Sequence, residues 1–443
     1  MSEAGIEQKY IKEAFDTNWV VPLGPNVNGF EQDLKEFVGM NKEVVALSAG
    51  TAAVHLALLA CGVGRGDEVI VQSFTFCASS HPITYLGATP IFVDSEKDTW
   101  NMDPQLLEEA IKDRIAKTGR KPKAIVPVYL YGMPAKIDEI MEIANRYDIP
   151  VIEDAAEGFG SMYKGQVCGT FGQYGVLSFN GNKMITTSGG GALICSPTPA
   201  LPSREGWGGA QTIMWLATQA REAYPYYQHE AIGYNYRMSN ICAGIGRGQM
   251  TIVNDHIAHH RHIQKMYEEL LKDVKGITVH SQPNNETNGT PDFDSNYWLC
   301  TILLHEDLRV KGEESAYAEA VQGAVGGAAG VVHGGGAVHT DCEPNRNVEA
   351  MRMALDKAGI ESRPLWKPMH KQPVYCAPLN DKEIMINEKM PCGAVCQTSA
   401  TSVAYVNGVS EALFKQGLCL PSGPCVTDEQ VVYIVDEIKK NIL

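Results

Sequence analysis

Seven short apolar runs in the first half of the chain place the strongest constraint on its fold. They are rich in valine, isoleucine and leucine and lie at 44–48, 68–73, 90–94, 123–129, 150–154, 175–179 and 191–196. Segments with helical spacing of apolar residues separate them, such as 51–62, 103–117 and 135–148. Near-continuous apolar strands are typical of a sheet that helices cover on both faces. We therefore expect an α/β fold with a mostly parallel sheet.

The net charge argues against a nucleic-acid-binding protein. The 443-residue chain carries 37 basic and 52 acidic side chains, a formal balance of −15, whereas binding to a nucleic-acid backbone needs clustered Lys and Arg. The amino terminus is charged, and no stretch approaches the roughly 20 uncharged apolar residues of a membrane span. We expect a cytoplasmic protein that binds neither nucleic acid nor membrane.

The second half of the chain predicts a smaller domain. A long helix is expected over roughly 240–274, followed by α+β segments. We assign residues 1–255 to a large domain with an N-terminal helical segment, and 256–443 to a linking helix and a small C-terminal α+β domain. Three stretches are expected to be loops or insertions of unassigned role. They lie near 201–214, 323–347 and 376–403.

The 12 cysteines are scattered and many lie in apolar runs. We expect buried free thiols rather than a disulfide framework. Cys392, Cys396, Cys419 and Cys425 lack the two-residue spacing of a zinc knuckle, so no structural metal is expected there.

Residues that follow the strands are the candidates for a site, because ligands of such sheets bind at the carboxyl ends of the strands. Ser48 to Thr51 follow the first run and open the helix at 51–62. A turn of small residues at a helix start presents free backbone N–H groups and the positive end of the helix dipole, which suits a phosphate. An ordinary helix start capped by Thr51 is the alternative interpretation.

Asp154 ends the run at 150–154, and Lys183 follows the run at 175–179. A buried carboxylate needs a proton donor or a cation. The protonated ring nitrogen of pyridoxal phosphate is one such partner, and a local structural cap is the alternative. A lysine near an apolar pocket loses its proton readily and can form a Schiff base with an aldehyde. A solvated loop lysine is the alternative for Lys183.

The motifs around these residues, taken in chain order, resemble the DegT/DnrJ/EryC1/StrS family of pyridoxal-phosphate-dependent nucleotide-sugar aminotransferases. The resemblance spans most of the chain and includes SAGTAAVHLAL, VIEDAAEGFGS, SFNGNKMITTSGGGAL, GYNYRMSN and SRPLWKPMH. It implies the fold type I aminotransferase architecture, with a seven-stranded sheet in the large domain and a smaller C-terminal domain. It also implies pyridoxal 5'-phosphate as the cofactor.

The resemblance implies roles for individual residues. Lys183 is implied to form the Schiff base with the cofactor and later to move a proton between the substrate carbon and the cofactor. Asp154 is implied to keep the pyridine nitrogen protonated. Phe76 is implied to stack on the ring, with a core aromatic as the alternative, and Glu157 to lie near the cofactor's 3-hydroxyl. The phosphate cradle is implied at Gly50, Thr51, Ala52 and Ser178.

The polar segment 233–240 implies a second subunit. In the resembling enzymes this segment crosses a dimer interface, and its asparagine, Asn235 here, reaches the phosphate in the neighbouring site. We therefore expect a homodimer with shared active sites. An asparagine that caps the following helix is the alternative.

Four histidines lie close together in the expected long helix, at 256, 259, 260 and 262. His256 and His260 have the i, i+4 spacing of a metal pair, but no glutamate lies between them as in the HExxH pattern. A solvated helical face is favoured, and no metal is expected.

Together these features predict an aminotransferase that moves an amino group from glutamate to a keto carbon of a nucleotide sugar. The segments SRPLWKPMH and ATQARE most resemble enzymes that act at carbon 4 of a UDP-4-keto-6-deoxy-N-acetylhexosamine. Amination at carbon 3, a GDP-linked sugar, and a non-catalytic relative that binds the cofactor or the sugar remain as alternatives. Lys183 argues against a related dehydratase branch, in which histidine replaces the lysine.

Overall fold

The computed structural model describes residues 5–196, 207–316, 342–376 and 402–443. Its centre is a sheet built from two four-stranded parts, in the orders β16-β3-β2-β4 and β5-β8-β9-β1. Parallel bridges between Ile125 and Val151 and between Val128 and Asp154 join the two parts where β4 meets β5. The strands are β1 (Glu43–Leu47), β2 (Glu68–Gln72), β3 (Thr89–Val93), β4 (Ala124–Val126), β5 (Ile152–Asp154), β8 (Tyr174–Ser178), β9 (Gly191–Cys195) and β16 (Val403–Tyr405).

All seven strands expected from the apolar runs are present. Only β9 runs against its neighbours β1 and β8, and the other pairs are parallel. The prediction of a mostly parallel sheet is confirmed.

The eighth strand, β16, was not expected from the sequence. It comes from the C-terminal half of the chain and pairs with β3. Asp94, which follows β3, anchors it by accepting hydrogen bonds from the backbone N–H groups of Asn407 (3.2 Å), Gly408 (2.9 Å) and Ser410 (3.1 Å). A three-residue strand has too little periodicity to be recognised alone.

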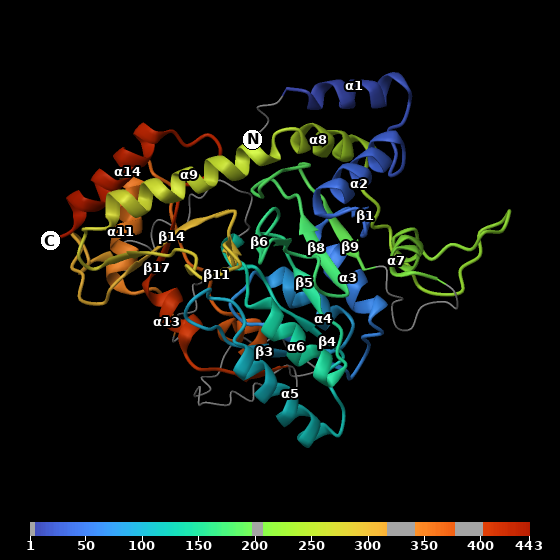
Figure 1. Cartoon of the computed structure of the whole chain (residues 1–443), viewed down its shortest axis with the longest axis horizontal. Helices are drawn as coiled ribbons and strands as arrows, with labels where there is room; N and C mark the ends of the chain where they lie inside the picture. The colour runs from blue at the N-terminus through green and yellow to red at the C-terminus, as the bar shows by residue number, and fades with distance from the viewer. Residues whose placement is uncertain (1–4, 197–206, 317–341, 377–401) are drawn as a thin grey trace.

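Helices cover both faces of the central sheet (Figure 1). Alternate residues of a strand point to opposite faces. Ile70 and Ile125 belong to one core with side chains of α2, α5 and α6, whereas Val69 and Val126 belong to another with side chains of α3, α4 and α7. The helices are α2 (Pro25–Val38), α3 (Gly50–Ala60), α4 (His81–Tyr85), α5 (Pro104–Thr118), α6 (Ile137–Tyr147) and α7 (Gly209–Ala217).

The expectation of a single helix over roughly 240–274 is wrong, because two helices occupy this segment. They are α8 (Asn240–Met250) and α9 (Val253–Leu271). Glycines let α8 pack closely on α1 (Glu7–Asp16) and α2: a Cβ at Gly248 would lie 2.5 Å from the side chain of Glu7. The break lets α8 lie on the N-terminal helices while α9 continues to the C-terminal part of the chain (Figure 1).

A separate apolar core lies in the C-terminal part of the chain. It surrounds an antiparallel sheet of order β10-β14-β17-β15. The strands and helices around this core, with α9, are β10 (Ile277–Val279), β14 (Cys300–Leu304), β15 (Arg363–Pro364), β17 (Gly417–Leu420), α11 (Arg346–Lys357) and α14 (Asp428–Asn441). Helix α13 (Val409–Gln416) instead places Leu413 in the core that contains Ile70 and Ile125. A division of the chain at residue 255 remains a proposal, since both β16 and β13 pair with strands of the first half.

Short elements complete the fold. They are β6 (Met162–Tyr163), β7 (Gln166–Val167), β11 (Glu286–Thr287), β12 (Thr290–Pro291), β13 (Phe293–Asp294), α12 (Pro373–Cys376) and the 3-10 turns η1 (Cys77–Ser79), η2 (Leu130–Gly132) and η3 (Met369–Lys371).

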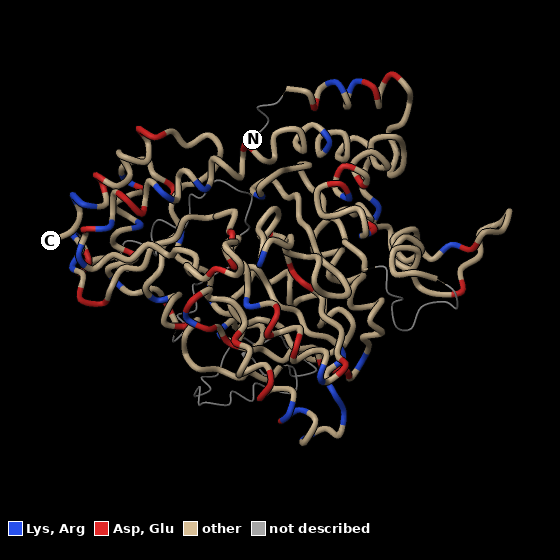
Figure 2. Tube along the Cα trace, in the orientation of Figure 1, with Lys and Arg blue, Asp and Glu red and all other residues tan. Residues whose placement is uncertain are grey.

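Acidic and basic residues are intermixed over the outer helices (Figure 2). Within the described ranges, no helix combines the length and the apolar content that a membrane span needs. The expectation of buried free thiols is confirmed for Cys61, Cys168, Cys195, Cys300 and Cys419. Cys425 is exposed, and Cys392 and Cys396 lie outside the described residues.

Candidate active site

A cleft of about 300 Å³ lies at the carboxyl ends of β1, β4, β5 and β8, the edge at which ligands of parallel sheets bind. The structure brings together most of the expected site residues there. Those that line the cleft are Gly50, Thr51, Phe76, Asp154, Glu157, Ser178 and Lys183.

Asp154 is buried at the bottom of the cleft and differs sharply from its neighbour Glu153. Glu153 accepts hydrogen bonds from three backbone N–H groups between residues 169 and 172 and from a tyrosine hydroxyl. Among the described residues, Asp154 accepts hydrogen bonds from the hydroxyl of Ser79 (2.6 Å) and the N–H of Ala156 (3.2 Å). Because a carboxylate has about four acceptor positions, Asp154 can accept a further donor.

Burial raises the pKa of Asp154, and the hydrogen bond from Ser79, the N–H of Ala156 and the charge of Lys183 act in the opposite direction. These three groups favour the ionised carboxylate. Ser79 is thus a site residue that the sequence reasoning missed, although it lies three residues after Phe76 in the same segment.

Lys183 lies between a carboxylate and an aromatic ring. Its Nζ is 3.2 Å from Oε1 of Glu157 and 4.1 Å from the centroid of the Trp298 ring. The other oxygen of Glu157 accepts a hydrogen bond from the backbone N–H of Tyr131 (2.8 Å). Burial raises the pKa of Glu157, and the charge of Lys183 acts in the opposite direction. The interpretation of Lys183 as a solvated loop lysine is wrong, because its side chain is only 12% exposed.

The turn after β1 offers backbone N–H groups to a ligand. Helix α3 begins at Gly50, its N-cap is Ala49, and no side chain caps it. The interpretation of Thr51 as an N-cap is therefore wrong, because Thr51 lies inside the first helical turn. Its hydroxyl is not used for capping, and the first N–H groups of the helix are left without a side-chain partner.

Close approach of three strands shapes this turn. A Cβ at Gly191, where β9 begins, would lie 2.5 Å from backbone atoms of Ala49 and Gly50, and a Cβ at Gly50 would lie 3.0 Å from Ser178. Glycine is therefore required at position 191, whereas a side chain at position 50 would need Ser178 to shift. Ala52 is buried beside the turn and does not line the cleft, so it can offer a ligand only its backbone.

Aromatic side chains form the mouth of the cleft. Phe76 is 54% exposed, and its ring centroid lies 5.4 Å from that of Trp366, which lies 5.3 Å from Tyr131 and 6.2 Å from Trp298. Phe76 is therefore not a core aromatic. Sequence reasoning did not single out Trp298 or Trp366, because both lie far along the chain from the strand ends.

Asn235 is exposed and does not line the cleft of its own chain. It bridges to Thr218, and the carbonyl of the next residue accepts a hydrogen bond from the N–H of Ser48 (2.8 Å). The alternative in which Asn235 caps the next helix is wrong, because Ser239 is the N-cap of α8.

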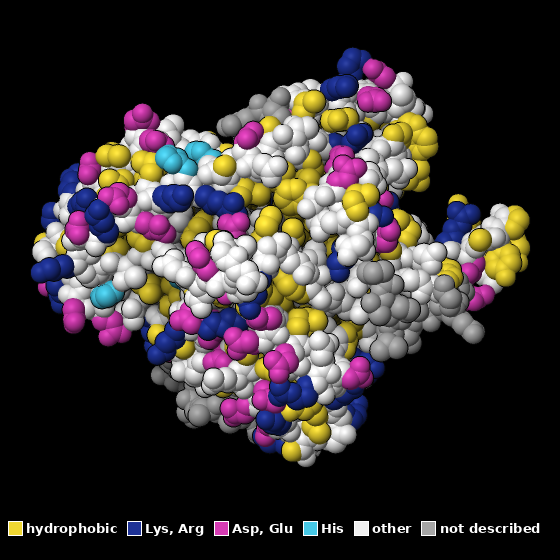
Figure 3. Space-filling model, in the orientation of Figure 1, with side chains coloured by type: hydrophobic (Ala, Val, Ile, Leu, Met, Phe, Trp, Pro, Cys, Tyr) yellow, Lys and Arg dark blue, Asp and Glu magenta, His cyan; other side chains and the backbone are white. Residues whose placement is uncertain are grey.

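The segment that precedes Asn235 projects from the body as an arm (Figure 1). Apolar and aromatic side chains cover its tip (Figure 3). The exposed ones are Tyr224, Tyr226, Tyr227 and Ile232.

The sequence profile of the DegT/DnrJ/EryC1/StrS aminotransferase family matches residues 2–326. The chain belongs to this family. A relative named as a pyridoxal phosphate-dependent aminotransferase, EpsN of Bacillus subtilis (strain 168), is 39% identical to this aminotransferase over 436 residues, covering 98% of this chain and 92% of the relative. GDP-perosamine synthase of Escherichia coli O157:H7 is 33% identical over 439 residues, covering 99% and 96%.

A solved structure of a family member from Brucella abortus has the same fold. It superposes with a TM-score of 0.75 at 25% identity, covering 98% of this chain and 95% of that one. The expected fold type I architecture, the pyridoxal-phosphate dependence and the class of sugar aminotransferase are thereby confirmed.

The residues of the cleft fit pyridoxal phosphate. Asp154 keeps acceptor capacity for a ring N–H, Lys183 reaches into the same space, and the turn around Gly50 offers free N–H groups beside the hydroxyls of Thr51 and Ser178. A buried carboxylate, a lysine and an anion-binding turn are the groups that such a cofactor needs from the protein.

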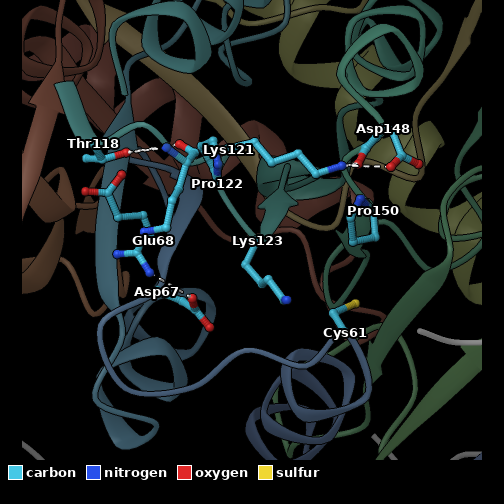
Figure 4. Close-up of a pocket in the computed structure, with 10 residues that line it drawn as sticks. Cys61, Asp67, Glu68, Thr118, Lys121, Pro122, Lys123, Asp148 and Pro150 are labelled. Carbon is cyan, nitrogen blue, oxygen red and sulfur yellow. Dashed lines mark hydrogen bonds and ion pairs between the residues drawn. The ribbon is translucent and has the colours of Figure 1, made fainter. Parts of the chain in front are cut away.

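A larger cavity, of about 520 Å³, lies at the amino ends of the strands, away from this cleft. Its basic residues include Lys121, which donates to Asp148 at 2.7 Å (Figure 4). Helices α3, α5 and α6 end beside the cavity at Cys61, Thr118 and Asp148.

The carboxyl ends of helices carry partial negative charge and attract cations, and Lys121 donates to the carbonyl oxygen of Tyr147 at the end of α6 (3.4 Å). Burial raises the pKa of the Cys61 thiol to about 12, which leaves it unreactive at neutral pH. None of the residues expected at the catalytic site lines the larger cavity.

The prediction of a solvated histidine face is wrong for two of the four residues. His256 and His260 are 4% and 3% exposed, and their Nδ1 atoms lie 3.1 Å from the carbonyl oxygens of Met184 and Tyr297. Burial lowers the pKa of His260 to about 4. Histidine is visible at the surface along α9 (Figure 3), where His262 contacts Asp428 at 2.8 Å. The described part of the chain holds no cluster of three or more metal ligands.

Proposed function

We propose that this enzyme transfers the amino group of glutamate to carbon 4 of a UDP-4-keto-6-deoxy-N-acetylhexosamine. The observation that carries the transfer chemistry is the placement of Lys183 and Asp154 in one cleft at the carboxyl ends of the strands. The choice of substrate is supported by the segments 217–222 and 362–370, which resemble enzymes that act at carbon 4. The second segment supplies Trp366 to the mouth of the cleft.

Pyridoxal phosphate, when bound, would supply the reactive carbonyl and the electron-withdrawing ring that allow an amino group to pass from the donor to the sugar. Lys183 would attach the cofactor and, once released, would move the proton at the substrate carbon as a general acid and base. Asp154 uses its remaining acceptor capacity to hold the proton on the ring nitrogen. Ser79 supports this role because its hydroxyl donates to the ionised carboxylate at 2.6 Å.

The remaining cleft residues bind and orient the cofactor. The backbone N–H groups of Gly50, Thr51 and Ala52 and the hydroxyls of Thr51 and Ser178 bind the phosphate, whose charge the positive end of α3 stabilises. Phe76, at the mouth of the cleft, would pack on the cofactor ring, and Glu157, beside Lys183, would lie near the 3-hydroxyl.

The site is shared between two subunits in this proposal. Asn235 lies outside its own cleft, on an exposed segment that follows a projecting aromatic arm. Exposed tyrosines are typical of interfaces. We infer a homodimer in which Asn235 of one subunit binds the phosphate held by the other.

Two alternative functions would use the same fold. A GDP-linked keto-sugar is supported by the similarity to GDP-perosamine synthase over nearly the whole chain, and amination at carbon 3 would use the same catalytic residues. A binding protein without turnover is disfavoured, because binding alone needs neither the lysine nor a carboxylate at the ring nitrogen.

A panel of nucleotide keto-sugars tests the substrate. The purified enzyme is incubated with glutamate, pyridoxal phosphate and each keto-sugar, and the products are read by mass, with Lys183→Ala as the matched control. We expect the UDP-linked 4-keto sugar to exchange its keto oxygen for an amino group fastest. Faster conversion of a GDP-linked or 3-keto sugar would contradict the proposed substrate while preserving the aminotransferase.

A further inference from the structure

Trp298 contacts the Lys183 loop in two independent ways. The face of its indole ring lies 4.1 Å from the ammonium of Lys183, and its indole N–H donates to the carbonyl oxygen of Asn182 at 2.7 Å. Trp298 is only 4% exposed and lies just before β14, in the C-terminal part of the chain. The side chain of Trp298 therefore contacts both the backbone of Asn182, just before the lysine, and the ammonium group of Lys183.

The position of Trp298 is itself fixed. Its backbone N–H donates to the side chain of Asn296 (2.8 Å), and its carbonyl accepts from Ser422 (3.0 Å). Asn296 also donates to the backbone carbonyl of Glu157 (2.8 Å). The two residues that contact Lys183, Glu157 and Trp298, are thus connected through hydrogen bonds to Asn296.

A lysine that attaches a cofactor covalently must also be kept in place while it is detached. It must leave the cofactor in one part of the cycle and return in another, yet its four-carbon stem is flexible and its ammonium is strongly hydrated. An aromatic face attracts such a cation, and the attraction is stronger when water is excluded. A fixed ring within reach of Lys183 can therefore hold the released ammonium inside the cleft.

We propose that Trp298 is a positioning residue for Lys183: its ring face holds the lysine ammonium when the lysine is not attached to the cofactor, and its N–H fixes the loop that carries the lysine. The inference rests on the proposed role of Lys183. Glu157 supplies the opposite charge and Trp298 the apolar face, so that the ammonium remains in the cleft instead of turning into water.

Selective acylation of lysines tests this role in the enzyme loaded with pyridoxamine phosphate, the form in which no lysine is attached to the cofactor. A water-soluble amine-acylating reagent is applied briefly, and labelling of each lysine is read from peptide masses. Trp298→Leu removes the ring face and the N–H, whereas Trp298→Phe removes the N–H and keeps a ring. Trp19→Phe, on a tryptophan that does not line the cleft, controls for loss of an indole.

We expect labelling of Lys183 to rise by at least about two- to fivefold in Trp298→Leu, the range of an exposed cation–π contact, because this contact is shielded from water and should be stronger. Trp298→Phe should restore most of the protection, and Trp19→Phe should match the wild type. Labelling of the other lysines should not change, which separates a local effect from unfolding. Unchanged labelling of Lys183 in Trp298→Leu would overturn the inference, as would equal labelling in the Leu and Phe variants.

A separate measurement distinguishes an error in the proposed role of Lys183 from an error in the role of Trp298. Borohydride reduction of the wild-type enzyme loaded with pyridoxal phosphate identifies the attached lysine independently of Trp298. Attachment to another lysine would refute the role of Lys183, whereas attachment to Lys183 with no labelling change in Trp298→Leu would refute only the role of Trp298.

Discussion

Removal of one hydroxyl should weaken catalysis without removing any group that contacts the substrate. The hydroxyl of Ser79 donates a hydrogen bond to Asp154 at 2.6 Å, and both residues are buried. The same hydroxyl forms a hydrogen bond with the hydroxyl of Thr75 at 2.8 Å. In Ser79→Ala, Asp154 loses one of the two hydrogen bonds that it accepts from described residues. The ionised form of the carboxylate loses the stronger of its fixed donors.

The expected loss of rate in Ser79→Ala follows from the negative charge of the hydrogen-bond acceptor, Asp154. A hydrogen bond to a charged group contributes about 1.5–3 kcal/mol, and each 1.4 kcal/mol corresponds to roughly a tenfold change in rate when it acts on the transition state. We therefore expect the half-reaction with glutamate to slow by roughly tenfold to a hundredfold. Because the lost bond lowered the pKa of Asp154, that pKa rises, and the acidic limb of the pH–rate profile moves to higher pH.

Single-turnover kinetics measure this effect. The enzyme loaded with pyridoxal phosphate is mixed with glutamate, and the decay of the visible absorbance is followed across pH. Ser80→Ala is the matched control: Ser80 is equally buried but bonds to Cys77 and Tyr375 instead of Asp154. Thermal unfolding of both variants shows whether the fold is equally affected.

Equal slowing in the two variants would refute the reasoning, because the loss would then reflect packing rather than the carboxylate. A Ser79→Ala enzyme with wild-type rates and an unmoved acidic limb would refute it as well.

Three further predictions follow from the site. Asp154→Asn should keep cofactor binding but slow turnover more than Ser79→Ala does, since the ring nitrogen loses the partner that keeps it protonated; a steady-state rate near that of the wild type would contradict this role. Gly191→Ala should weaken cofactor binding roughly fivefold or more, because overpacking costs about 1–3 kcal/mol and the new Cβ would lie 2.5 Å from the backbone of the phosphate turn. Equilibrium dialysis measures the affinity, with Gly64→Ala, in open space, as the control. Lys183→Ala and Asn235→Ala subunits, mixed and refolded together, should form heterodimers with one intact site of the two, and activity should recover at limiting cofactor; no recovery in demonstrated heterodimers would exclude the shared site.

The strands and their ends could be predicted from the sequence because each is a short, continuous signal. An apolar run identifies a buried strand, and the strand end places Asp154 and Lys183 on one edge of the sheet. Strand β16 and the packing of α8 gave no comparable local signal, since both depend on contacts with residues far away in the chain.

Partners of the site residues were harder to predict than the residues themselves. Trp298 reaches Lys183 only because the C-terminal part of the chain folds back on the cleft, and no local pattern marks that contact. His256 and His260 were misread for a related reason: a polar helical face is buried when backbone carbonyls of other segments accept its hydrogen bonds.

Trapping the attached lysine tests the central claim most directly. The purified enzyme is loaded with pyridoxal phosphate, reduced with borohydride and digested, and the modified peptide is identified by mass. We predict a single modified peptide that carries the reduced cofactor on Lys183, and complete loss of the modification in Lys183→Ala. Modification of a different lysine, or of none in protein that binds the cofactor, would contradict the account.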